Sequence, residues 1–476
     1  MTASADGDTQ TLAHAARVRL DAGDGAGALQ LFTLILEQDI NRADAFFGAG
    51  QALELMGNDT GAAASWRHAL TLDAGLAEAH GALAGLAARR RNWAEARREA
   101  QAALGLSADQ PTARIALALL DLHEARPADA VRRLEPVLAG AQAGDLQRAQ
   151  ALRIRGEALD RLDRTEQAFA HYAASAEIFR LRYAPACAGP EPMAGLDLCQ
   201  DLVRRYRHAG SELWRPAPGA ASGPAAEHVF LIGFPRSGTT LLEQVLAGHP
   251  RVAALEERPT LAPAIDAYLD PPSGVDALAK IDGAAAERWR ADYWRRVGEF
   301  GAAVDGRLFV DKQPFYGLWL PLIGKLFPEA KIIVARRDPR DVVFSCFRNP
   351  FRMTPITYEL MDLERAASLY AGVMEAIELF LARSANQAFV YRHEDLVDRF
   401  EPTLAALCTF LGLDWRDDMA RFQLTAGARD IRTPSAHQVM RPLNREGIGV
   451  WRRYARPLAP ILPRLRVLAE RYGYHD

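Results

Sequence analysis

The chain has 476 residues, 49% of them hydrophobic, and a formal net charge of −3, with 57 Lys and Arg against 60 Asp and Glu. This length predicts two or three domains, and the composition excludes wholesale disorder and a strongly basic nucleic-acid-binding protein. The only lysines are Lys280, Lys312, Lys325 and Lys331, so arginine supplies almost all of the positive charge. A GC-rich genome explains this bias without any function, but the bias makes a lysine inside a motif worth checking.

The cysteines and the termini favour a cytoplasmic protein. Cys187, Cys199, Cys346 and Cys408 show no metal-ligand spacing and are too few for a disulfide framework, so we expect reduced thiols. The polar first ten residues are unlike a signal peptide, and no apolar run reaches the roughly 18 residues that a membrane span needs.

After a polar N-terminus (1–9), the chain from 10 to 184 is rich in Ala, Leu and Arg and contains a repeat. A turn followed by an alanine five residues later starts at positions 23, 57, 91, 125 and 163, which gives three steps of 34 residues and one of 38. A period of 34 residues is typical of tetratricopeptide repeats, helix pairs that stack into a solenoid with a concave groove. We therefore expect about five repeats, with a peptide or protein partner in the groove. A generic Ala-rich helical bundle is the alternative, and homo-oligomerisation is left open.

The composition changes twice after the repeats. Residues 185–226 are rich in Pro, Gly and Ala and read as a linker region, with a short helix in DLCQDLVRRYRHAG. From 227 to 476, short apolar runs at 228–234, 307–311, 331–337 and 388–392 alternate with helical stretches. This alternation predicts an α/β domain with a mostly parallel sheet.

The first predicted strand runs into the loop Gly233-Phe-Pro-Arg-Ser-Gly238, which precedes a helix. A glycine-bounded loop between a strand and a helix binds phosphate, because its backbone N–H groups and the helix N-terminus point positive charge at the anion. A nucleoside triphosphatase or kinase would have lysine where Thr239 stands, and here Arg236 lies inside the loop instead. The alternative is a purely structural glycine turn.

The segment FPRSGTTLLEQVLAGHP resembles the 5′-phosphosulfate loop of sulfotransferases, which use 3′-phosphoadenosine 5′-phosphosulfate (PAPS) as sulfo donor. The whole chain is similar to bacterial proteins with tetratricopeptide repeats fused to a sulfotransferase domain, and more distantly to tyrosylprotein sulfotransferases. The resemblance implies a P-loop-like site in which the phosphosulfate is held by Pro235, Arg236, Ser237, Gly238, Thr239 and Thr240.

Three further motifs match the family. The segment VARRDPRDVVFS places Arg337 and Ser345 where the family holds the donor's 3′-phosphate, although a surface basic cluster would look similar. The segment HPRVAALEER places Glu257 as the catalytic base, with Glu256 as the alternative if the loop is shifted by one residue. The segment VDKQPFY places Lys312 where a cation stabilises charge on the bridging oxygen. The alternative for Glu256 and Glu257 is a solvated charged loop, and the alternative for Lys312 is a solvated lysine at the end of a strand.

The C-terminal segment SAHQVMRPLNREGIGVWRRY gives a weaker match, in which Ser435 and Arg445 touch the nucleotide. Here the chain has Glu446 and Gly447 where the family has an Arg-Ser pair, and His393 where the family has tyrosine. We expect PAPS-dependent sulfo transfer to a hydroxyl, with a protein tyrosine as one candidate acceptor, and no metal. A weakly catalytic nucleotide-binding scaffold is the alternative function.

Overall fold

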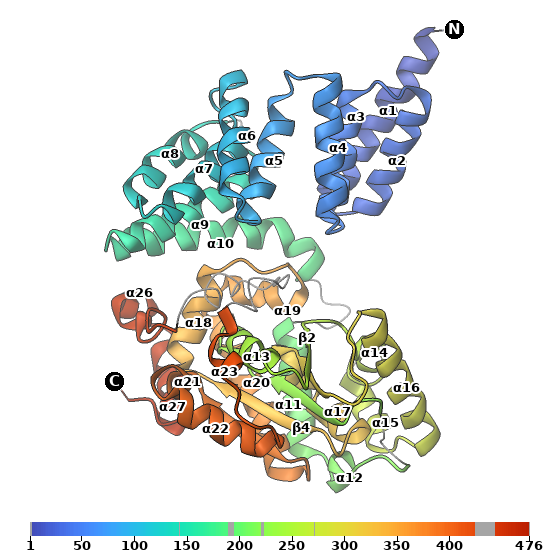
Figure 1. Ribbon diagram of the computed structural model, residues 1–476, viewed down its shortest axis with the longest axis vertical. Coiled ribbons are helices and arrows are strands. Elements are labelled where there is room, and N and C mark those ends of the chain that lie inside the picture. Colours follow the sequence, from blue (N-terminus) through green and yellow to red (C-terminus); the bar gives the residue numbers. More distant parts are fainter. Residues whose placement is uncertain are drawn as a thin grey trace. The chain divides into compact units, whose positions relative to one another are not determined.

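The computed structural model describes residues 2–141, 143–188, 195–219, 223–270, 272–423 and 443–475. The chain forms two compact units, Met1–Phe179 and Arg180–Asp476, which we describe one after the other (Figure 1). Among the described residues, no helix is both long enough and apolar enough to cross a membrane.

The first unit consists of paired helices. They are α1 (Thr2–Asp21), α2 (Gly25–Gln38), α3 (Ala43–Leu55), α4 (Asp59–Leu72), α5 (Ala77–Arg89), α6 (Trp93–Leu106), α7 (Pro111–His123), α8 (Pro127–Ala139), α9 (Asp145–Arg161) and α10 (Thr165–Cys187), the last of which continues into the second unit. The second helices of successive pairs begin at 25, 59, 93 and 127, steps of 34 residues, and then at 165. The predicted helical repeats are therefore confirmed, with the predicted period.

Each repeat buries its small residue where the two helices cross. Ala28, Ala62, Ala96, Ala130 and Ala168 are all 0% exposed. Four residues later along α4, Trp66 is also 0% exposed and packs so tightly on Gly50 that a Cβ there would lie 2.3 Å from the indole nitrogen. The repeated alanine is thus a packing requirement, because a larger side chain would separate the helices.

The turn inside each repeat has one residue with left-handed backbone. Its φ angle is 80° at Gly23, 77° at Gly57, 60° at Arg91, 57° at Ala125 and 58° at Asp163. In the first three repeats, Asp24, Asn58 and Asn92 follow and cap the next helix through a side-chain oxygen. The turn geometry is therefore constant, although glycine fills the left-handed position in only two repeats.

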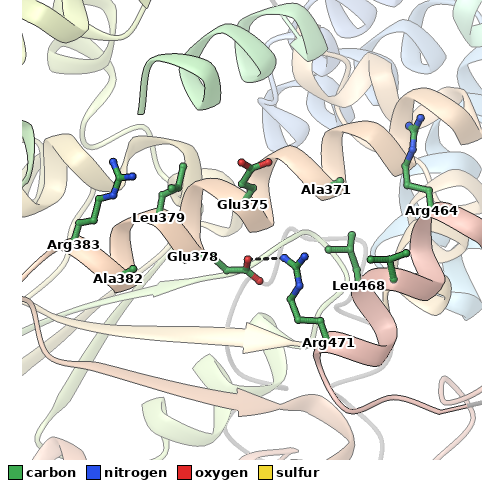
Figure 2. A pocket seen from close by; sticks show the side chains of 10 residues that line it. Ala371, Glu375, Glu378, Leu379, Ala382, Arg383, Arg464, Leu468 and Arg471 are labelled. Atoms are coloured by element: carbon green, nitrogen blue, oxygen red, sulfur yellow. Dashed lines mark hydrogen bonds and ion pairs between the residues drawn. The ribbon is translucent and has the colours of Figure 1, made fainter. Parts of the chain in front are cut away.

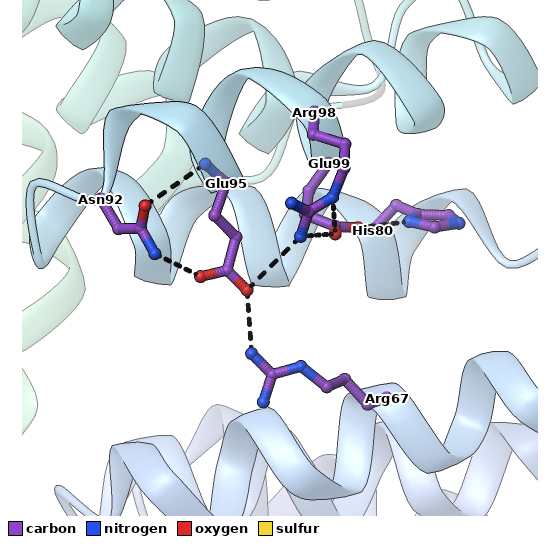
Figure 3. Close-up of polar contacts among 6 residues, drawn as sticks. All are labelled: Arg67, His80, Asn92, Glu95, Arg98 and Glu99. Atoms are coloured by element: carbon purple, nitrogen blue, oxygen red, sulfur yellow. Dashed lines mark hydrogen bonds and ion pairs between the residues drawn. The ribbon is translucent and has the colours of Figure 1, made fainter.

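Polar contacts link helices both between neighbouring repeats and within one repeat (Figure 3). Arg67 Nη2 of α4 donates to Glu95 Oε1 of α6 over 2.8 Å, and His80 Nδ1 of α5 lies 2.8 Å from Glu99 Oε2. A pair at the surface such as Arg67–Glu95 contributes about 0–1 kcal/mol, so contacts of this kind add little to the stability of the stack.

The second unit contains a parallel five-stranded sheet in the order β2-β3-β1-β4-β5. The strands are β1 (Glu227–Ile232), β2 (Val252–Glu256), β3 (Leu308–Lys312), β4 (Lys331–Arg336) and β5 (Ala388–Arg392). The interior of β1 is fully buried on both faces, as expected for the central strand of a parallel sheet. The predicted α/β domain with a parallel sheet is therefore confirmed.

Helices surround this sheet (Figure 1). They are α11 (Gly195–His208), α12 (Ser211–Trp214), α13 (Thr239–Ala247), α14 (Ala262–Tyr268), α15 (Val275–Ala279), α16 (Gly283–Glu299), α17 (Leu320–Leu326), α18 (Pro339–Arg348), α19 (Pro355–Tyr358), α20 (Leu363–Arg383), α21 (His393–Asp398), α22 (Phe400–Leu411), α23 (Asp417–Ala420), α26 (Ala455–Leu458) and α27 (Leu462–Arg471), with 3-10 turns η1 (Pro272–Gly274), η2 (Pro314–Trp319), η3 (Glu359–Met361) and η4 (Val450–Tyr454). Helix α11 packs against α20, so part of the segment 185–226 belongs to the second unit instead of connecting two units.

Candidate active site

The predicted site residues lie at one edge of the sheet, because all five strands are parallel and their carboxyl ends meet there. Glu256 ends β2 and is in register with Lys312, which ends β3. Leu231, near the end of the central strand β1, is the partner of Lys312 on its other side. Arg336 ends β4 beside Arg392 of β5. This edge is where open α/β sheets bind their ligands.

The loop between β1 and α13 adopts a tight, left-handed path. Arg236 has φ 70° and Gly238 has φ 93°. A Cβ on Gly238 would lie 2.4 Å from His393 Nδ1, so only glycine fits at this position. Cys346 Sγ donates to the carbonyl of Pro235 over 3.3 Å and fixes the loop from α18. Ser237, Thr239 and Thr240 are buried at the start of α13, where helix N–H groups are available to an anion.

Three side chains predicted to hold phosphate groups come together beside this loop. Arg236 Nε donates to Ser345 Oγ over 3.1 Å, and Arg337 Nη1 donates to the carbonyl of Arg236 over 2.8 Å. Both guanidinium groups are buried. Burial, and then the nearby Arg337 charge, lowers the pKa of Arg236 to about 10. Two buried cations side by side favour a multiply charged anion such as a phosphate group.

Lys312 is the centre of the predicted catalytic group. Its Nζ donates to Glu257 Oε1 over 2.7 Å and to Glu256 Oε1 over 3.3 Å, and it lies 3.5 Å from both Glu243 Oε2 and Thr240 Oγ1. The Lys312 side chain is 0% exposed, whereas that of Glu257 is 36% exposed. Glu257 has φ 45°, and its N–H donates to the carbonyl of Lys312 over 2.8 Å. The sheet thus places a buried cation directly against an accessible carboxylate.

A second polar network lies behind this pair, and the sequence reasoning missed it. Asp311 Oδ2 accepts hydrogen bonds from Thr260 Oγ1 at 2.8 Å and from Tyr293 Oη at 2.9 Å. Tyr316 Oη, 2.8 Å from Thr260 Oγ1, also accepts the N–H of Leu261. Burial raises the pKa of Asp311 to about 7. The network holds the chain that follows Glu257. The signal for it was an aspartate directly before the motif lysine, at the end of a buried strand.

The C-terminal segment approaches Arg337 at the position where the chain departs from the family. Arg337 Nη2 donates to the carbonyl of Gly447. Asp341 Oδ2 and Oδ1 accept the N–H groups of Gly449 at 2.6 Å and Trp451 at 2.9 Å, and so fix this segment. Arg445 is not brought to the loop, since its side chain is 70% exposed and pairs with Asp398 over 3.3 Å. Ser435 lies outside the described residues.

The residues that follow β5 also differ from the family pattern. Burial, and then the charges of Arg337 and Arg236, lowers the pKa of His393 to about 3, so this imidazole is neutral. Glu394 Oε1 accepts the N–H of Asp338 over 3.1 Å and Oε2 accepts from Tyr474 Oη over 2.9 Å. Glu394 therefore fastens the start of α18 to the C-terminus.

A hollow of about 660 Å³ between α20 and α27 is separate from this group (Figure 2). Arg471 Nη1 donates to Glu378 Oε2 across it over 2.9 Å. None of the predicted site residues lines it. In the described part of the chain, no group of three or more His, Cys, Asp or Glu residues is arranged to hold a metal ion.

These features define an α/β domain with a phosphate-type loop at its central strand, and comparison with known proteins shows which family this domain is similar to. The model of the Sulfotransferase family matches residues 228–417. Protein-tyrosine sulfotransferase 1 of Danio rerio is 26% identical over 257 residues, 50% of this chain and 71% of that protein. Nodulation protein NoeE of Sinorhizobium fredii is 28% identical over 211 residues, 39% of this chain and 50% of that protein. Residues 228–417 of the second unit are therefore similar to the Sulfotransferase family, which confirms the resemblance seen in the sequence.

Two further comparisons show how much of each protein the similarity covers. The chain matches an uncharacterized protein of Aquifex aeolicus with 27% identity over 248 residues, 50% of this chain, and spans only 32% of that protein's length. The sulfotransferase domain from the Synechococcus PCC 7002 olefin synthase is 24% identical, covers 55% of this chain and 100% of its own, and has a TM-score of 0.39. The chain thus spans about a third of the length of the Aquifex aeolicus protein and half of the length of NoeE.

Proposed function

We propose that the protein transfers a sulfo group from PAPS to a hydroxyl acceptor. The observation that carries the proposal is the contact between Lys312 Nζ and Glu257 Oε1 over 2.7 Å, beside a loop suited to a phosphosulfate. Of the two candidate bases, we favour Glu257, because its side chain is 36% exposed and that of Glu256 is 15% exposed. An acceptor from solution reaches the more exposed carboxylate more readily.

The residues divide the reaction between them. PAPS supplies an activated sulfo group on a bridging oxygen. Glu257 takes the proton of the acceptor hydroxyl while the acceptor oxygen bonds to sulfur, and Lys312 stabilises the electron pair left on the bridging oxygen as its bond to sulfur breaks. Arg236, Thr239 and Thr240 orient the 5′-phosphosulfate. Most of the rate enhancement comes from positioning and charge stabilisation, as in phosphoryl transfer.

Arg337 and Ser345 favour PAPS over ATP in this proposal, because they would bind the 3′-phosphate that ATP lacks. A planar guanidinium makes two parallel hydrogen bonds to a phosphate, and the serine hydroxyl adds a neutral donor. The acceptor is proposed to be a peptide or protein hydroxyl, such as a tyrosine, that the repeats recruit. Support comes from the repeats themselves and from the similarity to protein-tyrosine sulfotransferases.

The test combines binding with transfer. Calorimetry with the product 3′-phosphoadenosine 5′-phosphate (PAP) should show one site per chain. ³⁵S-labelled PAPS with a cell lysate should yield a labelled acceptor that mass spectrometry identifies. Glu257→Ala should abolish the label and keep PAP binding. Lys312→Arg should also lower transfer by about 100-fold, because a wide planar fork replaces a compact ammonium. Absence of PAP binding to the wild-type protein would overturn the proposal.

A nucleotide-binding scaffold is the second candidate, and one observation favours it. Arg337 already donates two of its five N–H groups to the carbonyls of Arg236 and Gly447, which leaves fewer of them for a 3′-phosphate. PAP binding without transfer to any protein, sugar or lipid acceptor would support the scaffold. Gly447→Ser, which restores part of the family pattern, should then tighten PAP binding.

A further inference from the structure

Glu243, which no sequence motif singled out, lies next to the predicted catalytic lysine. It is the fifth residue of α13, one turn after Thr239. Its Oε2 lies 3.5 Å from Lys312 Nζ, and Thr240 Oγ1 of the same helix lies 3.5 Å from the same nitrogen. Helix α13 therefore connects the phosphosulfate loop to Lys312 through two side chains.

Burial separates Glu243 from the other two carboxylates around Lys312. The side chains of Glu243 and Lys312 are both 0% exposed, whereas those of Glu256 and Glu257 are 15% and 36% exposed. Removing a carboxylate and an ammonium from water costs several kcal/mol per ion unless the two charges are paired. Glu243 and Lys312 thus form a pair that solvent does not screen, while Glu256 and Glu257 keep contact with water.

The proposed reaction needs such a pair. When Glu257 accepts the proton of the acceptor it becomes neutral, and it then no longer balances Lys312. At the same moment Lys312 must remain a cation, because charge is building on the bridging oxygen. A second carboxylate that is closed to the acceptor and keeps its charge solves this conflict, and Glu243 is fully buried in that position.

We propose that Glu243 is a positioning residue that fixes Lys312 and keeps it charged while Glu257 changes its protonation state. This inference rests on the proposed sulfo transfer for its purpose, but the interaction itself can be measured without any transfer.

The charged groups that face Lys312 support this assignment. They come from α13 (Glu243), from the end of β2 (Glu256) and from the following residue (Glu257), and Asp311 precedes Lys312 on β3. Burial by itself would lower the pKa of Lys312, but the charges of Glu243, then Glu257, then Glu256 outweigh it, and the pKa is raised above its ordinary value. Glu243 makes the largest of these three contributions.

The low lysine content allows a direct test. Protein labelled with ¹³C-lysine should give one Cε signal for each of Lys280, Lys312, Lys325 and Lys331, and the signal missing from Lys312→Gln identifies Lys312. We expect Glu243→Gln to lower the pKa of Lys312 by about one unit or more, and the matched Glu256→Gln to lower it by less than half as much. The alkaline limb of the kcat profile should move to lower pH in Glu243→Gln, which a merely structural role would not cause.

The outcomes are distinguishable from failure of the proposed function. An unchanged Lys312 pKa in Glu243→Gln, or equal shifts in both variants, overturns the role of Glu243 whether or not the protein transfers sulfo groups. A lowered pKa in a protein without transfer activity leaves the pair intact and contradicts sulfo transfer alone. If Glu243→Gln does not fold, Glu243→Asp replaces it, and a Lys312 pKa and kcat profile identical to wild type then overturn the proposal.

Discussion

Left-handed backbone at non-glycine residues occurs in both halves of the protein, but in different settings. Among the described residues these are Arg91, Ala125 and Asp163 in the repeats, and Arg236 and Glu257 in the α/β domain. The three repeat residues occupy one equivalent turn position, which Gly23 and Gly57 fill in other repeats. The two residues of the α/β domain lie in the candidate active site.

The comparison shows why strain is retained. A left-handed non-glycine residue costs roughly 1–2 kcal/mol. In the repeats, a Cβ at Gly23 or Gly57 would meet nothing within 4 Å, so the backbone alone sets the preference and the cost is tolerated. In the candidate active site, Arg236 is the proposed phosphosulfate ligand and Glu257 is the proposed base. Glycine at either position would relieve the strain but would remove the side chain that the proposed reaction needs.

Glu257→Gly and Glu257→Ala should both lower transfer of the labelled sulfo group by about 100- to 10,000-fold, because both remove the proposed base. The two variants should differ in stability, since both lose the contact with Lys312 but only glycine relieves the φ of 45°. We expect the free energy of unfolding, measured in urea, to be about 1 kcal/mol higher for Glu257→Gly than for Glu257→Ala. Transfer by either variant at the wild-type rate would remove Glu257 from the mechanism.

Arg236→Gly should weaken PAP binding by about 10- to 100-fold, because a buried charge-assisted hydrogen bond is worth about 1.5–3 kcal/mol. Arg236 also donates to Ser345, so the loss includes the orientation of that hydroxyl. Calorimetry measures the affinity, and Arg91→Gly, at a left-handed position in the repeats, is the matched control with unchanged affinity. Equal PAP affinity in both variants would contradict the role of Arg236.

Asp311→Asn tests whether Asp311, whose hydrogen bonds hold the segment after Glu257, titrates near neutral pH. The folded pKa of Asp311 is about 7, against an ordinary value of 3.8, so the folded state binds the extra proton between these values. Wild-type stability should therefore fall as pH rises from about 4 to about 7, by up to a few kcal/mol from this group. Asparagine keeps the acceptor for Thr260 and Tyr293 and does not titrate, so this part of the slope should disappear.

Urea unfolding at pH 5 and pH 8 measures the effect, and the variant should be the more stable protein at pH 8. An identical pH slope in wild type and Asp311→Asn would show that Asp311 does not titrate in this range. The turn at Gly57 in the repeats is different, since the exposed side chain of Asn58 caps the next helix there.

Much of the fold, but less of the site, could be predicted from the sequence. The 34-residue spacing of small residues is a local pattern, and the alternation of strands and helices follows from short apolar runs. Glu243 was missed because Leu-Leu-Glu-Gln is typical of an ordinary helix. Its partner Lys312 becomes visible only when α13 packs beside β3 in the fold. Asp311 was missed for a similar reason: its partners Thr260 and Tyr293 are distant in sequence. A local sequence motif does not show which residues from distant segments come into contact.

Ala125→Gly should give the smallest effect. Its φ of 57° matches the turn position that glycine occupies at Gly57, where φ is 77°. Relief of the left-handed conformation, reduced by the greater chain entropy of unfolded glycine, should stabilise the protein by up to about 1 kcal/mol. Gly57→Ala should destabilise it by a similar amount, because a Cβ there meets nothing within 4 Å and only the backbone responds.

Urea unfolding of both variants, followed through the repeats by circular dichroism, measures this reciprocal pair, while PAP affinity should stay at the wild-type value in each. Changes in the free energy of unfolding that are opposite in sign and similar in size would show that the strained backbone in the repeats serves only to form the turn. If Ala125→Gly instead weakened PAP binding or acceptor labelling, the left-handed residues of the repeats would be functional like Arg236 and Glu257, and the contrast between the two halves would fail.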